Sequence, residues 1–368
     1  MHLKKLHLVN FKNILQTELE LHQGINCFVG DNGAGKTNVL DALYYLSFCK
    51  SYFNSVDSQN VNHDEPFFVI QGEYERKDEK ELIYCGLKRG QKKYFKRNNK
   101  DYQKLSEHIG LLPLVMISPF DEQLINDGSE QRRKYIDGVI SQFDKKYLDD
   151  IMRYTKTLTQ RNASLKQMRD SGNRDDSMLD LWDEQLDSLG VRIYEKRVAF
   201  IKELVPVFQD YYAYISDNRE EISLEYTSHL QRGALKDMLR EVRSRDLVLG
   251  YTTRGIHKDD LDLMLKGFSI KKVASQGQRK TFLIALKLAQ YEFLYRHNGI
   301  KPVLLLDDIF DKLDETRSSR LLQLVADDKF NQIFITDTRK EHLVSTLEGT
   351  GKEFRIFTVS AGEIKEDL

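Results

Sequence analysis

Residues 30–37 constrain the fold of this chain more than any other segment. They read Gly-Asp-Asn-Gly-Ala-Gly-Lys-Thr, which is the P-loop pattern with Lys-Thr at its end. An apolar run typical of a strand, residues 25–29, precedes the pattern, and residues 38–46 have the apolar spacing of a helix. A phosphate-binding P-loop needs this order of strand, glycine-rich loop and helix. We therefore predict a nucleoside triphosphate site in an α/β fold.

The residue types of the P-loop suit phosphate binding. Backbone N–H groups and the N-terminus of the following helix cradle phosphate, and glycine lets the backbone approach it closely. Lys36 is expected to reach the β- and γ-phosphates and Thr37 to hold Mg²⁺ through its hydroxyl. A chance glycine-rich turn is the alternative, which the flanking strand and helix disfavour. The residues expected to contact ATP are Gly30, Asp31, Asn32, Gly33, Ala34, Gly35, Lys36 and Thr37.

A second part of the site is predicted near the other end of the chain. Residues 303–306 are an apolar run that ends in two carboxylates, Asp307 and Asp308. We predict that Asp307 contributes to Mg²⁺ binding as a Walker-B residue. Asp308, which would orient or deprotonate the attacking water, and Lys36 are the predicted catalytic residues. A plain strand end or a helix N-cap would also explain adjacent carboxylates, but the P-loop favours the functional interpretation.

Residues 275–278, Ser-Gln-Gly-Gln, stand shortly before that strand and directly before an expected helix, residues 281–289. A serine hydroxyl, a glycine backbone and a helix N-terminus can bind an anion. The same residues would also make an ordinary helix cap. This segment alone is weak evidence for a phosphate-binding site, but its position upstream of the Walker-B strand strengthens that interpretation.

The long segment between the two halves of the site has a different pattern. Charged residues interleave there with apolar ones at a spacing of three to four, which indicates helices. Residues 171–176 are polar and read as the turn of a helical hairpin. Before this segment, residues 66–74, 81–87 and 93–96 indicate an antiparallel meander. We predict an ATPase head built from residues 1–120 and 250–368, with a helical arm, residues 121–249, inserted between them.

Composition narrows the remaining classes of function. With 40% hydrophobic and 31% charged residues, the chain is typical of a soluble globular protein. It has no apolar run long enough to span a membrane and no signal-peptide core, so we expect a cytoplasmic protein without a membrane partner. Cys27, Cys49 and Cys85 are scattered and expected to be buried reduced thiols. The formal net charge is −1, so any DNA contact must come from local basic patches.

The order of P-loop, Ser-x-Gly-Gln, Walker-B strand and a downstream Leu313-Asp314 resembles the ATP-binding-cassette head fold. In that fold two heads sandwich two ATP molecules, and the signature motif of one head completes the site of the other. The resemblance implies that Ser275, Gly277 and Gln278 contact ATP bound to a second copy. It also implies that Asp314 is a D-loop residue at the dimer interface. The insert is longer than that of a transporter cassette and far shorter than the coiled coils of SMC proteins.

Several further segments of the chain form recognisable short motifs. They are Asn-Phe-Lys-Asn at 10–13, Cys-Lys-Ser-Tyr at 49–52, Ser-Pro-Phe-Asp at 118–121, a Gly-Ser…Arg-Arg…Asp segment at 128–137, and His-Lys-Asp-Asp-Leu at 257–261. Together with the compact insert, these segments resemble the RecF family of bacterial recombination mediators. Lys12 and Lys258 stand where that family favours arginine, which keeps the charge but loses the bidentate fork. Phe53 stands near a further family arginine, and the family's Q-loop residue is expected near residues 118–123.

The resemblance implies an ATP-gated DNA clamp of recombinational repair and replication restart. ATP would draw two copies together across DNA, and slow, DNA-stimulated hydrolysis would release them. Gapped or junction DNA, RecR and RecO are the implied partners, and recombinase loading is the implied outcome. One alternative is another head-type ATPase, either a nuclease subunit with an additional acidic metal cluster or a transport cassette with a membrane partner. A protein that binds nucleotide only for stability is a second alternative.

Basic runs are the candidate DNA contacts. Residues 88–100 form the densest run and contain two aromatic residues, and Arg132-Arg133 and Lys145-Lys146 are the next candidates. Their cations could neutralise phosphates, or the first run could be a solvated edge hairpin protected by lysine. No helix-turn-helix or zinc module is evident, so base readout is not expected.

Overall fold

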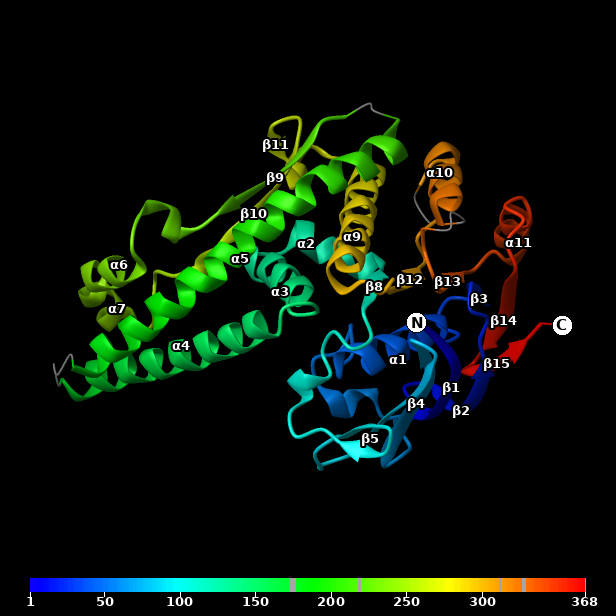
Figure 1. Ribbon diagram of the computed structural model, residues 1–368, viewed down its shortest axis with the longest axis horizontal. Coiled ribbons are helices and arrows are strands. Elements are labelled where there is room, and N and C mark those ends of the chain that lie inside the picture. Colours follow the sequence, from blue (N-terminus) through cyan, green and yellow to red (C-terminus); the bar gives the residue numbers. More distant parts are fainter. Residues whose placement is uncertain (173–176, 218–219, 311–312, 326–328, 368) are drawn as a thin grey trace. The chain divides into compact units, whose positions relative to one another are not determined.

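The computed structural model describes residues 1–172, 177–217, 220–310, 313–325 and 329–367, which form two compact units (Figure 1). Unit 1 comprises Met1–Glu122, Tyr211–Asn218 and Ser275–Leu368, and unit 2 comprises Gln123–Asp210 and Arg219–Ala274. Unit 1 is a mixed α/β body that contains the N-terminus and the last described residues of the chain. Unit 2 consists mainly of helices. The α/β class predicted for the head and the helical character predicted for the insert are both confirmed.

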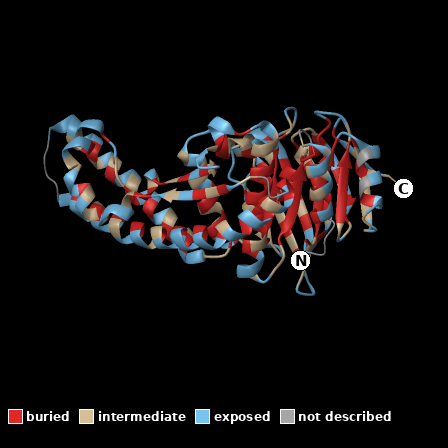
Figure 2. Cartoon of the chain, turned by 90° about the horizontal axis from the view of Figure 1, so that it is seen from above, coloured by how far each residue is buried: buried red, intermediate tan, exposed pale blue. Residues whose placement is uncertain are grey.

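The core of unit 1 is a six-stranded sheet with the order β15-β14-β3-β13-β12-β8. The strands from β14 to β8 run parallel, and β15 is antiparallel at one edge. All residues of β3, β8, β12 and β13 are buried, as expected for a parallel sheet covered on both faces (Figure 2). The P-loop and Asp307 therefore lie at the same edge, because parallel strands end together. The bounds are β3 Ile25–Val29, β8 Leu114–Ile117, β12 Val303–Asp307, β13 Ile333–Asp337, β14 Phe354–Ser360 and β15 Glu363–Glu366.

A second, antiparallel sheet of unit 1 has the order β2-β1-β4-β5-β6-β7 and includes the predicted meander. Helix α1, Lys36–Phe48, contacts strands of both sheets, and most of its residues are buried. Leu6, Leu40 and Leu305, one from each layer, belong to a single hydrophobic core. The bounds are β1 His2–Phe11, β2 Ile14–Glu20, β4 Phe67–Arg76, β5 Glu79–Lys88, β6 Tyr94–Arg97 and β7 Lys100–Asp101.

The remaining helices of unit 1 include α9, Gln276–Asn298, which begins at the predicted signature segment. Helix α9 contacts β8, and thirteen of its 23 residues are buried. The other elements are α10 Glu315–Val325, α11 Lys340–Glu348, η1 Asp57–Asn60, η2 Leu105–Glu107 and η3 Pro119–Glu122. No helix in the described ranges combines the length and the apolar character needed to cross a lipid bilayer.

Unit 2 contains the predicted helical hairpin and a small sheet. The hairpin consists of α4, Lys145–Ser171, and α5, Ser177–Ser216, whose last residues belong to unit 1. Most of the predicted turn, residues 173–176, falls outside the described residues. The other elements are α2 Gln123–Asn126, α3 Ser129–Ile140, β9 Ile222–Thr227, η4 His229–Arg232, α6 Leu235–Glu241, α7 Arg243–Leu249, η5 Ile256–Lys258, β10 Asp260–Leu265, β11 Phe268–Ser269 and α8 Ile270–Val273.

The division into units differs from the predicted boundary at residue 250. Strand β10 pairs antiparallel with β9 along its whole length, and β11 extends this sheet. Residues 250–274 therefore lie with the insert rather than with the head. The sequence shows that residues 261–265 favour a strand, but the choice of pairing partner depends on residues 222–227, which are distant in the chain.

Candidate active site

The P-loop follows β3 and leads into α1, and its glycines are required by geometry. Gly30, Gly33 and Gly35 have φ angles of 157°, 81° and 118°, which residues with a side chain rarely adopt. A Cβ atom on Gly30 would lie 2.1 Å from the carbonyl oxygen of Val359, and one on Gly35 would lie 2.7 Å from Asn13 Oδ1. A Cβ on Gly33 would meet no atom within 4 Å, so that position needs glycine for its backbone conformation alone.

Asn13 supports the P-loop from the turn between β1 and β2. Its Nδ2 donates a hydrogen bond to the carbonyl oxygen of Ala34 at 3.0 Å, and its Oδ1 accepts one from Asn38 Nδ2 at 2.7 Å. The loop is thus tied to the first turn of α1 through one side chain. Asn13 lies in the segment at 10–13, but nothing in the local sequence marks its contacts with the P-loop and α1.

Lys36 is buried, and its ammonium group lies against the P-loop backbone. Its Nζ donates hydrogen bonds to the carbonyl oxygens of Gly30 at 2.8 Å and Asp31 at 3.0 Å. Among the described residues no carboxylate lies within ion-pair distance of it. Its positive charge is therefore available to an anion bound in the loop.

Asp307 is the point at which the two predicted halves of the site meet. Thr37 Oγ1 donates a hydrogen bond to Asp307 Oδ1 at 2.8 Å, although 270 positions separate the two residues in the chain. Thr336 Oγ1 donates to the same oxygen at 2.8 Å, and Ser118 Oγ donates to Oδ2 at 3.3 Å. Burial raises the pKa of Asp307.

Ser118 and Thr336, which both contact Asp307, were not predicted as site residues from the sequence. Thr336 lies in β13, and Ser118 directly follows β8, so both flank the end of the Walker-B strand β12. Ser118 lies in the range expected for the Q-loop residue. In the sequence, each of these hydroxyl residues stands at the carboxyl end of a strongly apolar run. Their place beside Asp307 could not be predicted without the order of the strands in the sheet.

Asp308 has a strained and firmly anchored backbone. Its φ of 46° lies in the left-handed region, which is uncommon for residues other than glycine. Its N–H donates to Thr336 Oγ1 at 3.0 Å, and its carbonyl oxygen accepts a hydrogen bond from Lys280 Nζ at 2.9 Å. Burial, and then the neighbouring charge of Asp307, raise the pKa of its carboxyl group. Such strain is frequent where a side chain must be held in one direction for function.

The residues around Asp307 suit a magnesium ion carried by a nucleotide. Mg²⁺ prefers oxygen ligands and commonly takes one or two carboxylates together with substrate phosphates. The Thr37 hydroxyl and the Asp307 carboxylate lie 2.8 Å apart, and burial raises the pKa of both Asp307 and Asp308, so a bound cation would favour their ionised forms. The described residues contain no group of three or more His, Cys, Asp or Glu that could hold a metal. Phosphate oxygens would therefore have to complete the coordination of the ion.

The predicted signature segment begins α9. Ser275 is the N-cap residue, and its Oγ accepts a hydrogen bond from the N–H of Gln278 at 3.2 Å. Gln278 Oε1 in turn accepts one from the N–H of Ser275 at 2.7 Å, which completes a capping box. The segment is therefore a helix cap, the alternative named above. Ser275 is nevertheless exposed, so its capping role leaves it accessible to a ligand.

Asp314 lies before α10 and is connected to the signature segment. Its side chain is 61% exposed, its Oδ1 accepts a hydrogen bond from the N–H of Arg317 at 2.8 Å, and its Oδ2 lies 3.5 Å from Arg317 Nε. Arg317 NH1 donates to Thr281 Oγ1 at 3.3 Å, and Thr281 Oγ1 donates to the carbonyl oxygen of Gly277 at 2.8 Å. Two side chains thus link the predicted D-loop aspartate to the predicted signature glycine.

The segments at 10–13 and 49–52 meet on α1. Lys12 Nζ forms an ion pair with the buried Asp41 at 2.6 Å. Asp41 also accepts hydrogen bonds from Ser51 Oγ at 2.6 Å and from the N–H of Tyr52 at 2.7 Å. Lys12 therefore has a structural partner, which disfavours it as a DNA contact.

Three of the seven cations in the predicted basic run at 88–100, Arg89, Lys93 and Arg97, have partners within the fold of unit 1. Arg89 donates hydrogen bonds to the carbonyl oxygens of Glu65, Val61 and Asn62 at 3.1, 3.2 and 2.9 Å. Lys93 pairs with Asp57 at 2.7 Å, and Arg97 Nε donates to Glu81 Oε2 at 2.7 Å. These partners favour the interpretation as an edge hairpin over a phosphate-binding surface.

Arg132 and Arg133 also have partners, within unit 2. Arg132 forms a bidentate pair with Asp260, with distances of 2.7 and 3.0 Å. Arg133 NH1 donates to the carbonyl oxygen of Asp259 at 2.6 Å. The two arginines therefore attach α3 to the start of β10, and both guanidinium groups donate hydrogen bonds within unit 2. Asp260 and Asp259 lie more than 120 positions from these arginines in the chain, so the local sequence did not reveal these two contacts.

Replacing Gly30 with alanine is expected to raise the dissociation constant for ATP at least about tenfold, or about 1.4 kcal/mol. The new Cβ would overlap the carbonyl oxygen of Val359, so the loop or β14 would have to move. Titration of a fluorescent ATP analogue measures the effect. The control is Gly90→Ala, where φ is 76° and the Cβ meets no atom, so only backbone strain of about 1–2 kcal/mol is added. Equal ATP affinity of the two variants would contradict the required close approach at residue 30.

Comparison with known proteins identifies close relatives of this chain. The model of the RecF/RecN/SMC N-terminal domain family matches residues 2–364. The DNA replication and repair protein RecF of Phocaeicola vulgatus is 53% identical over 366 residues, covering 99% of this chain and 98% of the relative. That of Flavobacterium johnsoniae is 49% identical, covering 98% of this chain and all of the relative.

Solved structures show the same fold. The structure of the recombination mediator protein RecF with ATP, from the RecFOR pathway, has a TM-score of 0.90 and 31% identity and covers 100% of this chain and 98% of that chain. An SMC head bound to the C-terminal winged-helix domain of ScpA has a TM-score of 0.60 at 14% identity. The second likeness concerns the fold alone.

Proposed function

This chain belongs to the RecF family, within the wider RecF/RecN/SMC N-terminal domain family, and on that premise we propose that it is an ATP-dependent DNA-binding clamp of recombinational repair and replication restart. The observation that carries the proposal is the contact between Thr37 and Asp307 at the P-loop, 2.8 Å long. It joins the two residues that an ATPase of this kind needs at one magnesium ion. The solved relative with ATP supports ATP as the nucleotide.

Each residue of the site has a role in the proposed reaction. The backbone from Gly30 to Thr37 cradles the phosphates, and Lys36 places its charge on them. Thr37 and Asp307 would hold Mg²⁺, which would neutralise and orient the phosphates when bound. Asp308 orients the attacking water or accepts its proton, with its direction set by the contacts of its backbone to Thr336 and Lys280.

The proposed clamp forms by dimerisation. Ser275, Gly277 and Gln278 at the N-terminus of α9 would contact ATP held by a second copy, and Asp314 would lie at the interface. The exposure of Ser275 and Asp314 in the single chain supports this role. Lys280 and Arg317 connect these residues to the chain's own Walker-B segment and to each other, which supports coupling between the two ATP sites.

The proposed substrate is gapped or single-strand/double-strand junction DNA, and the proposed partners are RecR and RecO. Hydrolysis would be weak, stimulated by DNA, and used to release the clamp after it has helped to load recombinase in the cytoplasm. The solved relative is described as a recombination mediator of the RecFOR pathway, which supports these partners. No observation favours a nuclease subunit, since the described residues include no acidic metal cluster.

The Asp308→Asn variant tests the proposed switch. It should bind ATP and dimerise, but hydrolyse ATP at least about 100-fold more slowly, because asparagine cannot accept the proton of the attacking water. Light scattering followed over time should show a wild-type dimer that decays as ATP is consumed and a variant dimer that persists. Asp78→Asn is a matched control, since Asp78 is exposed and has a φ of 62° in unit 1. A wild-type hydrolysis rate in Asp308→Asn would remove Asp308 from the mechanism.

A further inference from the structure

Three cations of unit 2, none of which forms an ion pair with a described carboxylate, gather around one histidine. Arg232 ends η4, Arg254 precedes η5 and Lys258 ends η5, and we call these three with His229 the basic cluster. In the described part of unit 2, Arg254 contacts the ring of His229, and Lys258 lies 5.5 Å from the ring centre of Tyr251. No described carboxylate forms an ion pair with any of the three. They differ in this respect from Arg132, which is bonded to Asp260.

The positive charges of the cluster act on the same imidazole rings. The pKa of His229 is lowered by burial and then by the charges of Arg254, Arg232 and Lys258. The pKa of His257 is lowered to about 4, again first by burial and with Lys258, Arg133 and His229 contributing. Both rings are therefore neutral at neutral pH, and the cations of the cluster lie close enough to disfavour their protonation.

The two ring nitrogens of His229 both lie against hydrogen-bond donors. Its Nδ1 lies 3.2 Å from the backbone nitrogen of Gly255, and its Nε2 lies 3.1 Å from Arg254 NH1. A backbone N–H and a guanidinium N–H can each only donate, and a neutral imidazole has a single acceptor nitrogen. The ring can therefore accept from only one of the two donors. An anionic oxygen beside Arg254 would supply the acceptors that the ring lacks.

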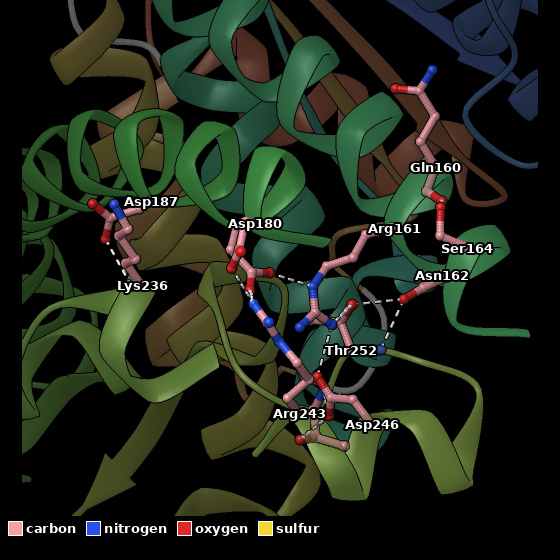
Figure 3. A network of polar contacts seen from close by, with 12 residues as sticks. Gln160, Arg161, Asn162, Ser164, Asp180, Asp187, Lys236, Arg243, Asp246 and Thr252 are labelled. Carbon is pink, nitrogen blue, oxygen red and sulfur yellow. Dashed lines mark hydrogen bonds and ion pairs between the residues drawn. The ribbon is translucent and has the colours of Figure 1, made fainter. Parts of the chain in front are cut away.

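The segment that carries Arg254 is anchored by buried polar contacts on α4 and α7 (Figure 3). Thr252 donates from its N–H and its Oγ1 to Asn162 Oδ1, at 2.8 and 2.7 Å, and its Oγ1 accepts from Arg161 NH1 at 2.9 Å. Thr253 donates from its N–H and its Oγ1 to Asp246 Oδ1, at 3.0 and 2.6 Å. The backbone before Arg254 is therefore fixed from inside unit 2.

The two 3₁₀ turns of the cluster are anchored as well. Arg197 NH1 donates to the carbonyl oxygen of Ile256 at 2.9 Å, and the Tyr154 hydroxyl lies 3.0 Å from His257 Nδ1. Ser228 and Gln231 form a capping box around η4. The cations thus extend from a pre-organised backbone, which lowers the entropic cost of binding a ligand.

We propose that the basic cluster binds the sugar–phosphate backbone of DNA, with Arg254 contacting one phosphate beside His229 and Arg232 and Lys258 contacting its neighbours. This rests on the proposed function as a DNA clamp. Guanidinium groups suit phosphate oxygens because they donate several hydrogen bonds in one plane. Tyr251 is 43% exposed beside Lys258, and an exposed aromatic ring next to cations can stack an unpaired base. A base has this stacking surface and an acidic peptide does not, which favours DNA.

The test is a triple variant, Arg232→Ala, Arg254→Ala and Lys258→Ala. Its binding to fluorescently labelled gapped DNA in the presence of ATP is measured by anisotropy over a range of salt concentrations. Each phosphate contact contributes about 0.9 to the slope of log affinity against log salt, so the slope should fall by about 2–3. The matched control removes three cations of unit 2 that already have carboxylate partners, Lys134, Arg153 and Arg169. Its slope should equal that of the wild type.

The outcomes separate this inference from the proposed function. Wild-type protein that binds no DNA with ATP would overturn the proposed function. If the wild-type protein binds DNA and the triple variant shows the same salt slope, the proposed DNA contact of the basic cluster is contradicted, while the proposed function is not. If the triple variant loses binding to labelled poly-glutamate but keeps its DNA slope, the cluster is a surface for an acidic protein. Should the triple variant fail to fold, Lys258→Glu changes one exposed side chain and should still lower the slope by about 1.

Discussion

Replacing Lys36 with methionine is expected to abolish ATP-dependent dimerisation and to slow ATP hydrolysis by about 100- to 1,000-fold, the range for loss of one pre-organised charge at a reacting centre. Methionine has similar length and fits a buried position, but it cannot donate to the carbonyl oxygens of Gly30 and Asp31 or to phosphate. The loop would lose both its internal brace and its positive charge. The raised pKa values of Asp307 and Asp308 would rise further, because the charge of Lys36 is one of the influences that lowers them.

The measurement is light scattering with and without ATP, together with the rate of phosphate release. Lys80→Met is the control, since Lys80 is an exposed residue of β5 in the same unit. The control should form a dimer with ATP and hydrolyse it at the wild-type rate. If Lys36→Met dimerises with ATP as readily as this control, ATP bound in the P-loop does not drive assembly.

Replacing Arg161 with methionine is expected to destabilise unit 2 by about 3–5 kcal/mol, the usual cost of removing one partner from a buried ion pair. Arg161 and its partners Asp183 and Asp246 all have side-chain exposures of 0%, and each ion pair is 2.7 Å long. Asp183 would keep its contact with Arg243, but Asp246 would keep only hydroxyl and backbone donors. A buried carboxylate without a cation would then remain between α4 and α7 (Figure 3).

Trp182 provides a selective measurement of this change. It is the single tryptophan of the chain and lies in α5 within unit 2, next to Asp183. Denaturant unfolding followed by its fluorescence therefore reports on unit 2. Arg153→Met is the control, because Arg153 and Asp149 are both 65% exposed and such surface pairs contribute about 0–1 kcal/mol. Equal unfolding midpoints for the two variants would show that the buried network carries little of the stability.

Local patterns predicted the elements that depend on neighbours in the chain. The glycines of the P-loop, its closing Lys36-Thr37 pair and the apolar run before Asp307 are visible without a structure, since each reflects a nearby backbone or burial requirement. The antiparallel meander and the helices α4 and α5 follow from hydrophobic periods of two and of three to four. The pairing of β10 with β9 was not predictable in this way, because the alternation of a strand does not identify its partner.

The sequence by itself determined the α/β head and the motifs of the predicted site: a P-loop, an apolar strand that ends in Asp307 and a Ser-x-Gly-Gln helix start. Only the tertiary structure decided which other groups complete that site. Ser118 and Thr336 reach Asp307 because the order of parallel strands places their hydroxyls on either side of β12. The same holds for charge: Arg89 and Arg132 have distant partners within the fold, whereas Arg232 and Lys258 have none among the described carboxylates. The sequence does not show whether a lysine or arginine has a partner within the fold, because that depends on residues that are distant in the chain and close only in the folded protein.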